Sequence, residues 1–254
     1  MITELGISNF KSWAHVDHRR LAPITGLFGT NSSGKTSILQ LLLMLKQTVE
    51  SPDRAQALIF GDERSTPANL GSFRDIIHKH DPTGTVAWDI MWNLPGTIIV
   101  KNPETPNKTL FESAKMGFRA EVGGIDDRLK VNSMTYQLGE HSFSMTRKGT
   151  NGDKYDLTGT PDNFKFVRTQ GRVWDLPAPV KCYGFPDQVK AYFQNAGFLS
   201  DLQLAFENMF GKMYYLGPLR EYPKRQYTWA GAEPADMGQR GERVVDALLA
   251  AVDR

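Results

Sequence analysis

Residues 29–36, Gly-Thr-Asn-Ser-Ser-Gly-Lys-Thr, have the spacing of a phosphate-binding loop. In this pattern, Gly29 and Gly34 let backbone N–H groups close around phosphate oxygens, and the Lys35 ammonium reaches the β and γ phosphates. The Thr36 hydroxyl stands where such a loop binds Mg²⁺. The other side chains expected at the site are Asn31, Ser32, Ser33 and Ser37. The spacing therefore predicts a site for ATP and Mg²⁺.

A phosphate-binding loop needs a strand before it and a helix after it. Residues 24–28 are a short apolar run typical of a buried strand, and residues 37–49 contain no Gly or Pro and are apolar on nearly every side, as in a buried helix. A helix that begins at the loop also favours a bound anion through its dipole. The alternative is a Gly-Ser turn that happens to carry a lysine, and the complete motif with both flanks favours the nucleotide site.

Composition narrows the class of protein. The 254 residues are 40% hydrophobic and 11% aromatic, which is enough for a packed core, and 30 basic against 28 acidic residues give no overall field for nucleic acid. Cys182 is the single cysteine, so an internal disulfide is excluded and a reducing compartment is favoured. Residues 1–20 do not resemble a signal peptide, and the longest apolar run, 41–45, is too short to cross a membrane. We expect a cytoplasmic protein with no membrane partner.

Hydrophobic periodicity predicts strands and helices along the chain. Alternating apolar residues predict strands at 1–12, 85–92, 116–122 and 141–147, and a further strand at 212–219. The strands at 85–92, 116–122 and 141–147 indicate an antiparallel β-rich region, in which Trp88 and Trp92 face the core. Apolar residues at helical spacing predict helices at 186–197, 199–211 and from 241 onward.

These elements predict three regions. Residues 1–60 form the strand-loop-helix unit, 61–180 a β-rich lobe, and 181–254 helices with a strand. The final helix carries no stop signal, so we expect the chain to continue beyond residue 254.

The Asn-Phe-Lys-Ser stretch at residues 9–12, followed by a loop of the form G-x-N-x-S-G-K-[ST], resembles the N-terminal half of an ABC-type ATPase head of the SMC and OLD-like AAA class. Further stretches look like the ATPases of bacterial anti-phage systems such as Septu, Gabija and retron-associated systems: 70–81, 214–223 and 237–249. The resemblance implies an α/β fold with an incomplete P-loop NTPase core, a β-rich antiparallel lobe and following helices. It also implies that Lys11 and Ser12 contact the phosphates.

The resemblance further implies that two copies associate around the nucleotide and gate an effector, namely a nuclease acting on invading DNA. A complete head also needs a serine-rich signature segment and an acidic Walker B strand, which the sequence does not show, so no catalytic residue is assigned. We therefore expect an ATPase only in the complete protein. The alternative is a non-hydrolytic nucleotide-sensing scaffold, in which a partner effector subunit does the chemistry.

Two other clusters have a functional and a plain interpretation. His78, His80 and Asp81 have residue types that bind metals. Two histidines with a lysine between them are more often part of a solvated loop, and no further strong ligand is near in the sequence. Basic and aromatic side chains alternate at 220–229, as in a nucleic-acid contact, but the balanced net charge favours a charged surface loop.

Overall fold

The computed structural model describes residues 1–62, 66–81, 83–101, 109–125, 128–149, 153–161, 164–171, 174–229, 231–234 and 236–252. The chain divides into two compact units, 1–211 and 212–254, and the boundaries expected near residues 60 and 180 both fall inside the first unit. In the described part, no helix is both long and apolar enough for a membrane crossing.

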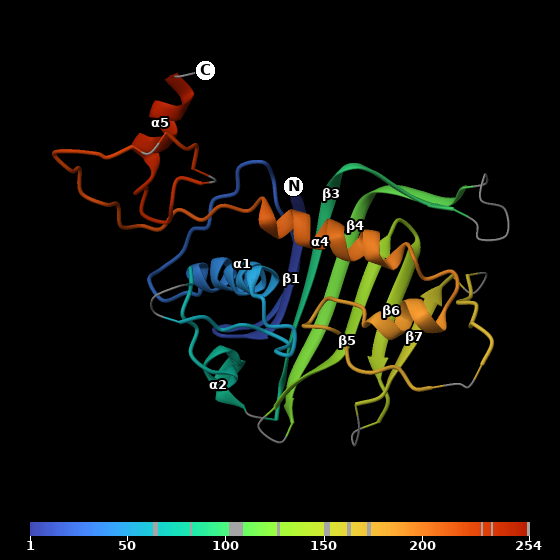
Figure 1. The fold of residues 1–254 in the computed structure, drawn as a ribbon. Coiled ribbons are helices and arrows are strands. Elements are labelled where there is room, and N and C mark those ends of the chain that lie inside the picture. Colours follow the sequence, from blue (N-terminus) through green and yellow to red (C-terminus); the bar gives the residue numbers. More distant parts are fainter. Residues whose placement is uncertain are drawn as a thin grey trace. The chain divides into compact units, whose positions relative to one another are not determined.

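One seven-stranded antiparallel sheet forms the body of the first unit (Figure 1). Its strands are β1 (Ile2–Phe10), β2 (Trp13–Arg20), β3 (Thr85–Lys101), β4 (Thr109–Ile125), β5 (Arg128–Leu138), β6 (His141–Arg147) and β7 (Tyr155–Thr160). They lie in the order β2-β1-β3-β4-β5-β6-β7, so β1 pairs with β3 across the long segment between β2 and β3. That segment carries the loop at 29–36.

The alternation predicted at 85–92 is confirmed on β3. On β3, Val86, Trp88, Ile90 and Trp92 are all buried, while Asp89 between them is only partly covered. Successive strand residues point to opposite faces, so one face of the sheet is apolar and the other polar. The apolar face carries the core and the helices that cover it.

The expected fold class is wrong: the sheet contains no parallel pair among the described strands, whereas a P-loop NTPase core is built on a parallel sheet. The strand predicted before the loop at 24–28 is irregular, and Ile24 and Phe28 are 92% and 94% exposed. A strand forms only where a neighbour accepts its backbone hydrogen bonds, and no described strand pairs with this run. The apolar composition of 24–28 is therefore not sufficient to form a strand. The strand predicted at 212–219 is irregular as well.

Two helices cover the apolar face of the sheet. The helix predicted after the loop is confirmed as α1 (Lys35–Glu50), and that predicted at 199–211 is confirmed as α4 (Leu199–Gly211). Figure 1 shows α4 running across the sheet, where the Phe206 ring lies 6.1 Å from Trp92 of β3 and 4.6 Å from Phe118 of β4. Shorter helical segments are α2 (Phe73–Ile76), η1 (His78–His80) and α3 (Asp187–Tyr192). The loop is thus attached to a helix that belongs to the main core.

The C-terminal end of α1 is capped by a buried lysine. The Lys181 ammonium donates hydrogen bonds to the carbonyls of Thr48 at 2.7 Å, Val49 at 3.0 Å and Ser51 at 2.7 Å. The last carbonyls of a helix have no partner within the helix and carry the negative end of its dipole, so a cation here satisfies both. Burial lowers the pKa of Lys181, while Glu207 acts in the opposite direction. This contact ties α1 to the chain segment before α3.

The second unit contains α5 (Val244–Val252) and irregular chain. No described residue of α5 is buried, and Leu248 and Val252 are 59% and 81% exposed. Within the basic and aromatic stretch at 220–229, the Lys224 ammonium lies 2.9 Å from the Glu221 carboxylate. That stretch therefore neutralises part of its own positive charge.

Replacing Lys181 with methionine tests the helix cap. Lys181→Met keeps the aliphatic stem but removes the donor for three carbonyls, so we expect a loss of about 2–3 kcal/mol in the free energy of unfolding. Urea denaturation measures it. Lys148→Met is the control, since the Lys148 side chain makes exposed ion pairs with Asp156 and Asp175 and its loss should change stability little. Equal effects of the two substitutions would show that the cap is not a stabilising contact.

Candidate functional site

The loop at 29–36 turns the chain directly into α1. Gly34 is the N-cap residue of α1 with φ 89°, and Ser32 before it also has a positive φ of 63°. No side chain caps this end of α1. The first N–H groups of a helix have no acceptor within it, so an uncapped N-terminus that follows a glycine turn offers donors to an anion.

The loop and the turn between β1 and β2 line one cleft of about 290 Å³. The lining residues are Lys11, Ser12, Ser32, Ser33, Gly34, Lys35, Thr36 and Ser37. All eight are residues that the sequence predicts for the site. Two further predicted residues, Gly29 and Asn31, belong to the loop but do not line the cleft. The structure thus brings together two lining segments, 11–12 and 32–37, that are separated in the chain.

The Lys35 side chain folds back over the loop. Its ammonium donates hydrogen bonds to the carbonyl of Gly29 at 2.9 Å and to that of Thr30 at 2.6 Å. These two acceptors hold the charge beside the cleft. A phosphate oxygen is a stronger acceptor for an ammonium than a neutral carbonyl, so an anion in the cleft would compete for the same group.

The turn at residues 9–12 has an unusual backbone. Asn9 and Lys11 have φ of 59° and 49°, a left-handed conformation that costs a non-glycine residue on the order of 1–3 kcal/mol. Contacts with the α2–η1 segment hold it: the Lys11 N–H donates to the Ile76 carbonyl at 2.6 Å, and His78 Nδ1 donates to the Lys11 carbonyl at 2.7 Å. These bonds keep the turn in the conformation that places Lys11 and Ser12 in the cleft.

The Lys11 side chain is half-buried. Burial lowers its pKa, and the Asp75 carboxylate acts in the opposite direction. A phosphate bound nearby would favour the charged ammonium in the same way as Asp75 does. The turn therefore supplies the cleft with a cation whose charge a bound anion would stabilise.

Trp13 belongs to the site but is not among the residues predicted from sequence. Its indole Nε1–H donates to the Gly34 carbonyl at 2.9 Å. The sequence gives one signal that Trp13 lies near the site, namely its position directly after Lys11 and Ser12. Nothing in that spacing identifies Gly34 as its hydrogen-bond partner.

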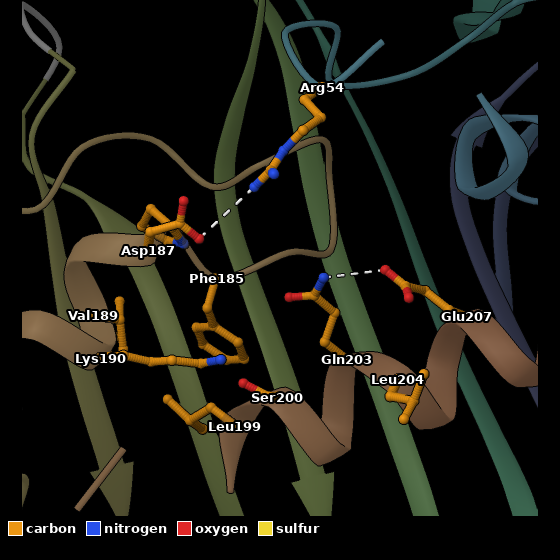
Figure 2. Close-up of a pocket in the computed structure, with 11 residues that line it drawn as sticks. Arg54, Phe185, Asp187, Val189, Lys190, Leu199, Ser200, Gln203, Leu204 and Glu207 are labelled. Carbon is orange, nitrogen blue, oxygen red and sulfur yellow. Dashed lines mark hydrogen bonds and ion pairs between the residues drawn. The ribbon is translucent and has the colours of Figure 1, made fainter. Parts of the chain in front are cut away.

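A second cleft, of about 160 Å³, lies between α3, α4 and the residues after α1 (Figure 2). Figure 2 shows Arg54 directed toward Asp187, 3.8 Å away, and Gln203 directed toward Glu207, to which it donates at 3.1 Å. Arg54, Asp187 and Glu207 thus face partners of the protein itself, and the charged lining residues are two basic, Arg54 and Lys190, and two acidic, Asp187 and Glu207. The cleft offers no excess of charge that would select a ligand.

The two histidines considered as metal ligands contact backbone carbonyls: His78 bonds that of Lys11, and His80 Nδ1 bonds that of Arg74 at 2.8 Å. In the ranges that the structure describes, no three His, Cys, Asp or Glu side chains are grouped to hold a metal ion. Among known proteins, no family model matches the chain and no curated protein matches it. The loop cleft is therefore the candidate site on the strength of its own geometry.

Substitution of Gly34 tests the geometry of the loop. An alanine Cβ at this position would overlap the Ser12 Oγ and approach Trp13 Nε1 to 2.9 Å, at a φ that alanine rarely adopts. We expect Gly34→Ala to lower the free energy of unfolding by at least about 1–2 kcal/mol, measured by chemical denaturation. Gly96→Ala is the control, because a Cβ there meets no atom within 4 Å. A neutral Gly34→Ala would contradict the close approach of turn and loop.

Proposed function

We propose that the chain binds ATP together with Mg²⁺ in the cleft between the turn at 9–12 and the loop at 29–36. The observation that carries the proposal is that Lys11 and Lys35, from separate segments, line one cleft at the uncapped N-terminus of α1. Two ammonium groups, the backbone N–H groups at the start of α1 and serine hydroxyls together match the charge and the acceptors of a triphosphate.

Mg²⁺ fits this set of groups through Thr36. The Thr36 side chain is exposed in the cleft, and Mg²⁺ takes most of its remaining ligands from phosphate oxygens and water. The ion would neutralise part of the phosphate charge, while Lys11 and Lys35 hold the rest. Thr36 is accordingly the proposed metal ligand of this chain.

The residues of the cleft suit ATP binding but not ATP hydrolysis. None of the eight described residues that line the cleft is acidic, so none of them can orient an attacking water as a carboxylate would. This favours the second candidate function, a nucleotide-sensing scaffold whose partner does the chemistry. Association of two copies around the nucleotide, and the gating of a nuclease effector in anti-phage defence, are supported by the sequence resemblance at residues 9–12 and 29–36.

Removing the Lys35 ammonium tests the site. Lys35→Ala should weaken ATP binding at least about tenfold, because the phosphates lose a cation. The fold should stay intact, since the ammonium bonds the carbonyls of two exposed loop residues, Gly29 and Thr30. Isothermal titration calorimetry gives the affinity and a melting curve checks the fold. Lys115→Ala, an exposed lysine on β4, is the control. Unchanged affinity in Lys35→Ala would refute the assignment of the loop.

Phosphate release distinguishes the two functions. The chain alone should bind ATP·Mg²⁺ yet turn it over far below the enzyme range of about 1 s⁻¹, because the described cleft holds no carboxylate. A steady-state assay of released phosphate measures the rate, with Lys35→Ala as the background. Turnover of about 1 s⁻¹ or faster would favour the ATPase over the scaffold.

A further inference from the structure

The peptide between Gly34 and Lys35 is the first backbone unit of α1 at the cleft. Its carbonyl, on Gly34, accepts two hydrogen bonds, from the Ser37 N–H at 3.0 Å and from Trp13 Nε1–H at 2.9 Å. A trans peptide is planar, so its N–H points opposite to its C=O. Fixing the Gly34 carbonyl therefore fixes the direction of the Lys35 N–H, which points out of the helix N-terminus.

Trp13 is well placed to hold this peptide. It is the first residue of β2, pairs with Phe10 across the turn, and is half-buried against the loop. Both Ser12 and Trp13 lie so near Gly34 that a side chain there would collide with them. The indole thus reaches the loop from a rigid strand end and not from a flexible segment.

The contact restrains Gly34, a residue with high rotational freedom. Glycine has no Cβ to restrict its rotation, and Gly34 has a φ of 89°. Without Trp13, the Gly34 carbonyl would keep the hydrogen bond from the Ser37 N–H within the helix but would have no donor from the turn. The second donor removes rotational freedom that the loop would otherwise have to lose when an anion binds.

We propose that Trp13 is a positioning residue for phosphate binding: its indole N–H fixes the Gly34 carbonyl and so aims the Lys35 N–H into the cleft. Trp13 itself donates to the protein and not to the ligand. This inference rests on the proposed binding of ATP, and it adds a residue that the phosphate-loop motif does not contain.

The test is Trp13→Phe, which keeps an aromatic ring and removes the indole N–H. The affinities for ATP·Mg²⁺ and for inorganic tripolyphosphate should both fall about three- to tenfold, the range for one hydrogen bond, because the contact acts through the phosphates. The melting temperature of the nucleotide-free protein should stay close to that of the wild type. Trp229→Phe is the matched control, since Trp229 also donates its indole N–H to a backbone carbonyl, that of Ala232 at 3.2 Å.

Tryptophan emission gives a second readout. Tripolyphosphate should change the emission of the wild type and of Trp229→Phe, because the Trp13 indole is bonded to the loop, and this change should be absent from Trp13→Phe. A wild type that binds neither ATP nor tripolyphosphate would overturn the proposed function. A wild type that binds both, with unchanged affinities in Trp13→Phe, would overturn the positioning role alone. A weaker affinity that accompanies a clear drop in melting temperature would also overturn it, because a general structural defect would then explain the loss.

Discussion

The hydrogen bonds from the Lys181 ammonium to the carbonyls at the C-terminal end of α1 anchor the helix that carries the loop. A helix is stiff over its length, so a fixed C-terminal end together with buried Leu41 and Met44 leaves its N-terminus little freedom. The loop is joined to that N-terminus without an intervening residue. A cation thus satisfies one end of the helix dipole within the protein, and the other end is left open to an anion from outside.

The turn between β1 and β2 completes the cleft at a cost in backbone conformation. Asn9 and Lys11 are both left-handed, and the bonds from Lys11 N–H to Ile76 and from His78 to Lys11 offset that cost. Strain of this kind persists only where neighbouring structure holds it. Here the neighbours belong to the α2–η1 segment, which thereby acts as a support for the site without lining it.

Part of this arrangement could be predicted from the sequence and part could not. The loop, α1 and the alternation on β3 depend on neighbouring residues, so spacing and periodicity identify them. The fold class depends on strand partners far away in the chain, and the apolar run at 24–28 does not show whether a partner exists. The bond from Trp13 to Gly34 escaped prediction for the same reason, since it joins residues twenty-one positions apart. Lys11 and Ser12 could be predicted as site residues only from the resemblance to a family, because no local sequence pattern relates their position to that of the loop.

The strand order has a consequence for how the site is assembled during folding. Each strand from β3 to β6 pairs with the strand that follows it in the chain, so these pairings form from local contacts at a low cost in loop-closure entropy. The pairing of β1 with β3 joins Ser8 to Ala87 and must enclose the whole segment that carries the loop and α1. The meander is therefore expected to nucleate first, and the cleft to take shape only when β1 docks at its edge.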